Sequence, residues 1–528
     1  MQPAEIEFLT AAKTAYIIRI DYRKGALTVK RKALAVMLAV VLLLLTACST
    51  TNKYGDAFRF PLGGEPKQLD PQMAQDAASV AVLRSLMSGL TALSEQGEPT
   101  AAIAERWEVN GATWIFTLRS SAWSDGTAVT AADFVYGWGR AVDPDIRSPL
   151  AEKFANVKSV QADGERRLVV ELHVPDPHFA TVVADTAFFP CHEEFFLKTE
   201  GRYGLEAEDV LCNGPFRLTR WEHGEYLIMR RNDGFYAAED VRPDAVRYVI
   251  PEVKDRVKAL KEGELDATEL TAAEAGKLKG KVPVVAVKDS VFALWFNTSV
   301  SALQDAAVRK ALRDTLEWQL IREQAASMGH AIDGTDFIPP AASFGGSAYP
   351  AGTAADPTIG NSAAGAAVLK AAKLPSLTVI CTDNPDELQL ARLMVQSWQK
   401  NANLYFSLKA LTKAEFEAHL AVGNYQIAIG EAVGYSGNAA GALGAYLSDG
   451  AENPTRLQDA ALAEQLRQAD TVGKLLACEQ RLHDLCPAVP LWYGERWFAT
   501  GEEISGVIIR PFNGHPHGAI YGFLHAEK

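Results

Sequence analysis

The stretch that most constrains the fold is residues 103–144. Between residues 113 and 119, large apolar side chains occupy every second position, which is the period expected of a half-buried β-strand. A Ser-Asp-Gly sequence at 124–126 then favours a tight turn. Thr130 begins a capping-box pattern ahead of apolar residues at helical spacing. The stretch therefore predicts a strand, a turn and a capped helix, and the buried face of the strand consists of Trp114, Phe116 and Leu118.

The same stretch resembles the signature of the extracytoplasmic solute-binding proteins of peptide-type ABC importers, known as solute-binding family 5. Further segments carry the pattern of this family, and they are 63–71, 213–216, 231–236, 261–266, 296–312 and 490–493. The resemblance is dense before residue 315 and patchy after it. It implies a bilobal α/β fold like that of the type II periplasmic binding proteins in their large three-subdomain form, with mixed β-sheets flanked by helices. It also implies that 103–144 is scaffold that does not touch the ligand.

The length of the chain, 528 residues, is too great for a single hydrophobic core. The resemblance implies a discontinuous lobe I built from 50–76, 206–290 and 488–528. Within it, we expect 77–205 to form an inserted scaffold subdomain. Lobe II is expected to comprise 291–487.

The N-terminal residues 1–47 are expected to be a signal peptide with extra residues at its start. Three basic residues at 30–32 precede an apolar run at 33–45. As a helix this run spans only ~20 Å, which is short of the ~30 Å hydrocarbon layer of a membrane. Translation is expected to begin near residues 27–29. The sequence Leu-Thr-Ala ahead of Cys48 resembles a lipobox, which implies cleavage before Cys48 and a lipid on its sulfur.

The net charge of −13 argues against nucleic acid as a partner, because like charges repel. The chain contains no nucleotide-binding G-x-x-x-x-G-K-[ST] sequence, so transport energy would come from separate ATPase subunits. The resemblance implies a monomer outside the cytoplasm that is held on the membrane by its N-terminal lipid. Its expected partners are an oligopeptide or other small solute, an ABC permease and the ATPase subunits.

Five cysteines follow Cys48, and none of them forms a C-x-x-C pair, so neither a zinc ribbon nor a redox pair is indicated. Cys191 and Cys212 could form a disulfide in an exported protein, or both could be small buried thiols. No cofactor is expected. No metal site is expected either, because three C-terminal histidines lack a predicted shared geometry. They are His515, His517 and His525.

The ligand site departs from the family pattern in the loop 430–437. Oligopeptide-binding members carry an aspartate there for the α-ammonium group of the peptide, and Gly434 stands in its place. Glu431 is the only acid in the loop and is expected to replace that aspartate, although a solvated glutamate is the plainer alternative. A tyrosine typical of the family is also replaced, by Leu150. The candidate ligand-binding residues are Glu431, Gly434, Tyr435, Leu150 and Gln75.

Three functions are compatible with these features. The leading one is a receptor whose two lobes close around a short peptide and deliver it to a permease. The second is the same fold binding a sugar, a nickel chelate or another non-peptide solute. The third is a cell-surface hydrolase, but the segment 434–438 falls short of the G-x-S-x-G elbow and no H-E-x-x-H is present. We therefore expect a binding protein and no enzyme.

Overall fold

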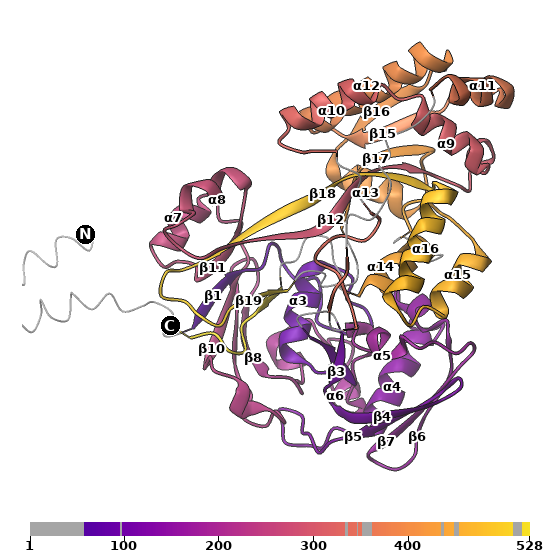
Figure 1. Cartoon of the computed structure of the whole chain (residues 1–528). Helices are drawn as coiled ribbons and strands as arrows, with labels where there is room; N and C mark the ends of the chain where they lie inside the picture. The colour runs from indigo at the N-terminus through magenta and orange to yellow at the C-terminus, as the bar shows by residue number, and fades with distance from the viewer. Residues whose placement is uncertain are drawn as a thin grey trace, which may run out of the picture. The chain divides into compact units, whose positions relative to one another are not determined.

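The computed structural model describes most of the chain after residue 56 as strands, helices and their connections (Figure 1). The described residues are 57–94, 98–332, 336–345, 347–350, 362–433, 438–447, 453–510 and 520–527. The predicted signal peptide at 1–47 and Cys48 lie outside these ranges. Within them, no helix combines the length and the apolar character required to span a bilayer. The predicted α/β class is confirmed by three larger sheets and the helices packed on them.

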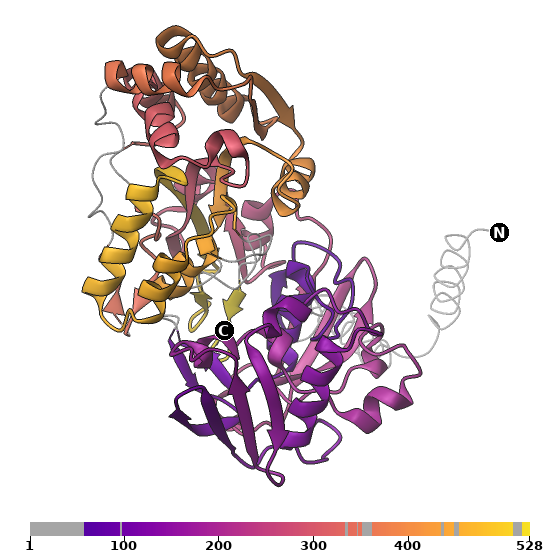
Figure 2. The same ribbon diagram turned by 90° about the vertical axis from the view of Figure 1, so that its right-hand side faces the viewer.

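The predicted strand and capped helix belong to a four-stranded antiparallel sheet, whose strands lie next to one another in purple in Figure 2. Its strands, in spatial order, are β4 (Ala104–Asn110), β5 (Thr113–Leu118), β7 (Arg167–Leu172) and β6 (Val157–Ala162). Every second residue of β5 is buried, as predicted. Helix α4 (Ala131–Val142) begins where the carboxylate of Asp133 accepts a hydrogen bond from the backbone N–H of Thr130, at 2.7 Å.

Helix α3 (Ala77–Leu86) is shorter than its apolar pattern predicts, because that pattern continues to residue 93. The helix ends here because the backbone groups of its last residue and of the residues that follow form hydrogen bonds with residues outside the helix. The backbone N–H of Gly214 donates to the carbonyl of Leu86, and the backbone N–H of Ser88 donates to the side chain of Asn213. Long-range hydrogen bonds thus override the local helical pattern.

A second sheet joins segments from distant parts of the sequence. Its order is β1 (Phe58–Pro61), β10 (Ala245–Val249), β9 (Tyr226–Arg231) and β8 (Phe216–Glu222). Strands β1 and β10 are parallel, and the other two pairs are antiparallel. Phe523, near the end of the chain, packs in the core of this sheet against Phe60 and Phe216.

The largest sheet has six strands and depends on two long ones, β12 (Val284–Phe296) and β18 (Ala488–Thr500). The others are β11 (Ala267–Leu270), β17 (Ile427–Val433), β15 (Thr378–Thr382) and β16 (Ser407–Leu411). In Figure 1, β12 and β18 run together from β11 towards β17. The predicted boundary between the lobes at 290/291 falls inside β12, and the division into lobes stays a prediction.

Both faces of the six-stranded sheet are covered by helices. One face packs on α9 (Ala306–Asp314), α10 (Trp318–Ser327), α11 (Ser362–Ala372) and α12 (Pro385–Ala402). The other packs on α13 (Lys413–Ala421), α14 (Ala439–Gly444), α15 (Ala460–Arg467) and α16 (Val472–Leu485). The remaining helices and strands are β2 (Thr91–Leu93), β3 (Pro99–Ala101), α5 (Phe179–Val182), α6 (Glu193–Lys198), α7 (Arg256–Lys261), α8 (Ala272–Leu278), β13 (Ser343–Phe344), β14 (Ser347–Ala348), β19 (Ile508–Arg510) and β20 (Ile520–Gly522).

The segment 341–367 is rich in alanine, glycine, serine and proline, which predicts a surface loop that leads into a helix over 366–373, and this prediction is wrong at the C-terminal end of the segment. Helix α11 begins at Ser362, and 366 was the expected start. The small residues serve helix packing, because a Cβ on Gly365 would lie 3.1 Å from the carbonyl oxygen of Ala311 in α9. Glycine therefore permits the close approach of the two helices.

The five cysteines that follow Cys48 are all buried free thiols. Cys191 and Cys212 do not form a disulfide, so the alternative of small buried thiols holds for both. The sulfur of Cys191 accepts a hydrogen bond from Arg140 at 3.5 Å.

Candidate functional site

Glu431 lies near the end of β17, where a row of buried side chains gives way to an exposed one. Successive residues of a strand face opposite sides, so Glu431 shares its face with Ile427 and Ile429. These two isoleucines are fully buried, whereas Glu431 is exposed. The hydroxyl of Ser290, on β12, donates a hydrogen bond to the Glu431 carboxylate. Among the described residues, Glu431 forms no ion pair with a lysine or an arginine.

Gly494 makes room for this carboxylate. It lies on β18 directly opposite Ser290 of β12. A Cβ at position 494 would overlap both the carboxylate of Glu431 and the hydroxyl of Ser290. The bare backbone of Gly494 therefore allows the two polar side chains to meet above the strand pair.

An aromatic stack adjoins the carboxylate on the same face of the sheet. Phe292 lies opposite Glu431, and its ring stacks on Trp492 with centroids 4.1 Å apart. His330 stacks on Trp492 in turn, at 4.7 Å and an interplanar angle of 10°. Burial lowers the pKa of His330, and the nearby carboxylates of Glu431 and Glu495 only partly oppose this effect. His330 is therefore uncharged at neutral pH.

The lowered pKa of His330 predicts a pH dependence of stability. Protonation favours the unfolded chain, whose histidines titrate near 6.5, so His330 destabilises the fold as the pH falls through that value. Urea unfolding at pH 7.5 and 5.5 measures the change. We expect His330→Gln to lose less stability over this interval than the wild type does. His173→Gln, which changes an exposed histidine, serves as the control. Equal losses in His330→Gln and the wild type would contradict the prediction.

A guanidinium on the neighbouring strand β18 is paired with another carboxylate. Arg496, on β18, donates through Nε to Oδ1 of Asp289 at 3.0 Å, and its Nη2 forms an ion pair with Oδ2. The side chain of Asp289 is fully buried. This bidentate pair fixes the strands beside Ser290, and Arg496 forms no ion pair with Glu431 among the described residues.

The other candidate ligand residues have different surroundings. Leu150 is buried in the core beneath the sheet of β4 to β7, and Gln75 is exposed in the loop before α3. Gly434 and Tyr435 lie outside the described residues. Among the described residues, no hydrogen bond or ion pair links Glu431 with Gln75 or Leu150. The ligand-binding role of all five candidates stays a prediction.

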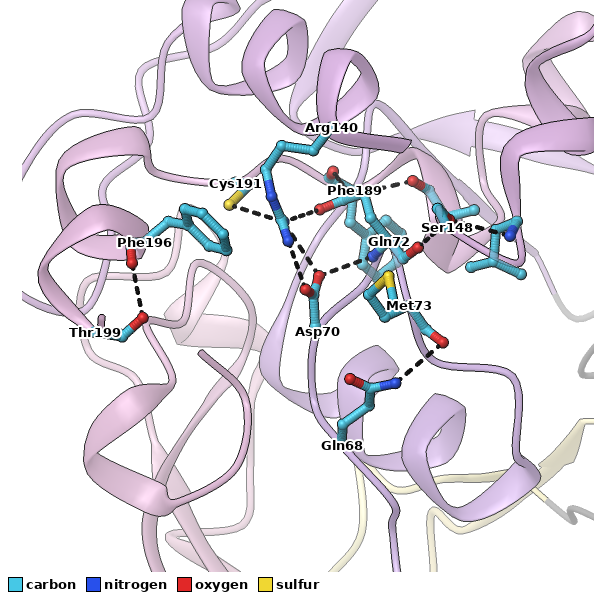
Figure 3. A network of polar contacts seen from close by, with 12 residues as sticks. Gln68, Asp70, Gln72, Met73, Arg140, Ser148, Phe189, Cys191, Phe196 and Thr199 are labelled. Carbon is cyan, nitrogen blue, oxygen red and sulfur yellow. Dashed lines mark hydrogen bonds and ion pairs between the residues drawn. The ribbon is translucent and has the colours of Figure 1, made fainter. Parts of the chain in front are cut away.

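A buried polar network holds the segment that leads to Gln75 (Figure 3). The guanidinium of Arg140, on α4, forms an ion pair with Asp70, and the distance from Nη2 to Oδ2 is 2.6 Å. Nη1 also donates to Oε1 of Gln72 at 3.0 Å. The ring of Phe196 covers the guanidinium, whose Cζ lies 3.8 Å from the ring centroid. The side chains of Arg140 and Asp70 are about 5% exposed, so the pair is screened from solvent.

The same network extends to two further connections. The amide of Gln72 donates to the carbonyl oxygens of Ala187 and Phe189, at 3.2 and 2.9 Å. The hydroxyl of Ser148 donates to the backbone carbonyl of Gln72. Every contact in this network is structural. The Asp70 and Arg140 positions of the family pattern therefore support the scaffold and hold the loop of Gln75 in place.

Sequence reasoning selected Glu431 but missed the residues that shape its surroundings. Ser290, Gly494 and His330 become neighbours of Glu431 only through the pairing of β12 with β17 and β18 and through the packing of His330 on Trp492. None of the three forms a motif with Glu431 in the sequence. The sole signal was the family-like segment 490–493, which ends one residue before Gly494.

Comparison with known proteins relates the chain to one family. Residues 98–454 match the family described as bacterial extracellular solute-binding proteins, family 5 middle. The oligopeptide-binding protein OppA of Bacillus subtilis is 28% identical over 354 residues, which cover 59% of this chain and 64% of that protein. The probable deoxycholate-binding periplasmic protein YgiS of Escherichia coli is 30% identical over 308 residues, or 54% of this chain and 57% of that protein. The chain thus matches somewhat less than two thirds of each of these relatives.

Solved structures agree with the expected fold. OppA of Listeria monocytogenes, bound to peptide, superimposes with a TM-score of 0.66 at 20% identity, over 89% of this chain and 98% of that one. The predicted fold of a type II periplasmic binding protein is confirmed by this similarity.

Proposed function

The chain belongs to the bacterial extracellular solute-binding proteins of family 5, and from this premise we propose that it is the substrate-binding subunit of an ABC importer for short peptides. The observation that carries the proposal is the family match over residues 98–454, which reaches from the scaffold through β17 and Glu431. An ABC permease and its ATPase subunits are the proposed partners. The protein acts by binding, and it needs no catalytic residues.

Glu431 is the proposed acceptor for the α-ammonium group of the peptide. It is an exposed carboxylate with one described hydrogen-bond donor, the hydroxyl of Ser290, and it has further lone pairs for a ligand. A charge-assisted hydrogen bond of this kind contributes about 1.5–3 kcal/mol. Beside it, Phe292 and Trp492 are buried, and the half-buried ring of His330, which stacks on Trp492, offers surface to a neighbouring side chain of the ligand.

Capture would involve closure of two lobes around the ligand. The predicted boundary between the lobes falls inside β12, and β12 pairs with β18 along most of its length. Each of these strands is 13 residues long, so together they form a continuous connection that supports the proposal. Contacts that form only in the closed state would favour closure when peptide is bound.

The first experiment is native mass spectrometry of the purified protein, followed by peptide binding to a Glu431→Gln variant. Co-purifying masses that fragment as peptides would support the peptide function. For such a peptide, we expect Glu431→Gln to weaken binding roughly tenfold or more. The N-acetylated peptide lacks the ammonium charge, and its binding is expected to be weak and unchanged by the substitution.

Glu495→Gln is the matched control, because Glu495 is another exposed carboxylate, one residue after Gly494. It is expected to bind both peptides as the wild type does. If Glu431→Gln bound the free peptide with wild-type affinity, the role of Glu431 would be wrong, whereas the peptide function would stand.

A non-peptide solute is the second candidate, and two observations favour it. One of the relatives is named as a probable deoxycholate-binding protein, and the aspartate expected for peptide recognition is replaced by Gly434. A single co-purifying non-peptide mass would select this alternative.

We propose that the protein is a lipoprotein, anchored outside the cytoplasm through Cys48. The basic residues, the short apolar run and the lipobox-like sequence before this cysteine support the proposal. Labelling with radioactive palmitate in the bacterial host is expected for the wild type and absent in Cys48→Ser. Cys212→Ser is the control, because this thiol is buried in the fold. Equal labelling of Cys48→Ser and the wild type would exclude this anchor.

A further inference from the structure

A cluster of possible metal ligands lies on the side of the six-stranded sheet opposite to Glu431. Asp336, Glu479 and His483 each offer one ligand atom, and these atoms lie within 4.8 Å of one another. The backbone N–H of Asp336 donates to the hydroxyl of Tyr493 at 3.0 Å. Tyr493 follows Trp492 on β18, so its side chain points to the other face. The cluster is therefore separate from the proposed ligand site.

The carboxylates of this cluster are buried. Asp336 is 0% exposed and Glu479 is 2% exposed. Glu479 accepts hydrogen bonds from the backbone N–H of Ile338 at 3.0 Å and from the hydroxyl of Tyr349 at 2.9 Å. Both donors are neutral, and among the described residues Glu479 has no lysine or arginine at ion-pair distance. Burial of two adjacent carboxylates costs free energy when Glu479 has no positively charged partner, unless a proton or a cation lies between them.

His483 supplies the observation that favours a cation. Its Nε2 atom is buried and has no hydrogen-bond partner in the described part of the chain. Glu479 and His483 are four residues apart on α16, so their side chains lie on one face of the helix. The ring of Phe337 contacts the imidazole, with centroids 4.7 Å apart, and restricts its orientation. A half-buried imidazole whose buried Nε2 atom is unused, beside two carboxylates, is a typical ligand set for a transition metal.

We propose that Asp336, Glu479 and His483 bind a divalent first-row transition-metal ion, with Zn²⁺ as the ion that best suits the set. Imidazole disfavours Ca²⁺ and Mg²⁺, which prefer oxygen ligands, and the absence of a thiolate from the three disfavours Cu⁺. Ligand atoms around a tetrahedral zinc ion are roughly 3.4 Å apart, since each lies ~2.0–2.2 Å from the metal. A small rotation of the three side chains would reach that spacing.

The ion would have a structural role. Asp336 comes from the segment between α10 and β13, and the other two ligands come from α16. The metal would tie that segment to the helix. It would not contact a ligand bound at Glu431, because the sheet lies between them.

The test uses the full chain, stripped with a chelator, dialysed and titrated with ZnCl₂ alone in a calorimeter. We expect one zinc ion per chain and a higher midpoint of thermal unfolding in its presence. His483→Gln keeps a polar side chain but removes the imidazole, and it is expected to weaken this binding by roughly tenfold or more. The double variant His515→Gln, His517→Gln is the matched control for non-specific zinc binding by other histidines. It is expected to bind zinc as the wild type does.

Two results would overturn the proposal. One is the absence of binding at one equivalent, which would leave a carboxyl–carboxylate pair held by a proton. The other is zinc binding that His483→Gln leaves unchanged and the C-terminal double variant removes. If His483→Gln fails to fold, the visible spectrum of the wild type with Co²⁺ decides. Visible absorption bands of bound Co²⁺ that disappear when zinc is added, with no thiolate charge-transfer band, support the site. A spectrum without such Co²⁺ bands rejects it.

Discussion

Replacing Arg140 with methionine is expected to lower the free energy of unfolding by about 3–5 kcal/mol. The substitution leaves Asp70 buried without its positive partner, at a site where water cannot replace the lost contact. It also removes a donor to Gln72, which connects the loop after β1 to the segment at Ala187 and Phe189. Urea unfolding followed by tryptophan fluorescence measures the loss.

The control for Arg140 is a pair of opposite charges on the surface. Lys158 and Glu171 lie 2.7 Å apart, but their side chains are 52% and 44% exposed. Lys158→Met is therefore expected to change stability by no more than about 1 kcal/mol. The double variant Arg140→Met, Asp70→Leu removes both buried charges and is expected to recover much of the loss. A loss below about 1 kcal/mol for Arg140→Met alone would contradict the structural role of the pair.

The second large effect is expected at Arg309, in α9. Its side chain is 2% exposed, and it donates to the carbonyl oxygens of Leu303 and Gln304 through Nη1, at 2.6 and 2.8 Å. It also donates to the carbonyls of Leu485 and Cys486 at the end of α16. Helix ends leave carbonyl groups unpaired, and here a positive charge meets the negative end of the helix dipole.

Arg309→Met is expected to cost about 3 kcal/mol or more, because several buried acceptors lose their donor at once. Lys310→Met is the matched control on the same helix, since Lys310 is only half-buried and its side chain forms no hydrogen bond among the described residues. It is expected to change stability by about 0.5 kcal/mol or less. Thermal unfolding monitored by circular dichroism compares the two variants. Similar midpoints for both would show that Arg309 is dispensable.

Local sequence patterns correctly predicted the elements that depend on residues close together in the sequence. The alternation in β5, the turn at 124–126 and the cap of α4 are each determined within a few residues, and each was correct. The apolar stripe of Leu390, Leu393, Met394 and Trp398 also predicts an amphipathic helix over 387–400, and α12 contains this helix. By contrast, the end of α3 and the start of α11 depend on partners far away in the sequence, and both were misplaced.

The candidate site could be predicted only as single residues. Strand register decides which side chains share a face, and a shift by one residue would move Ser290 away from Glu431. The pairing of Ser290 with Gly494 and of Phe292 with Glu431 is long-range information that no local pattern contains. The cluster of Asp336, Glu479 and His483 was missed for the same reason, because only its two helical members are close in sequence.

The bare backbone at Gly494 has a consequence for how relatives of this chain could diverge. Mutation of this codon to that of any larger residue would push the carboxylate of Glu431 off the strand pair while leaving Glu431 itself unchanged. After gene duplication, two copies could therefore acquire different preferences for charged solutes without any change among their acidic residues. A sequence comparison restricted to acidic residues would not distinguish such copies, whereas the residue at position 494 would distinguish them.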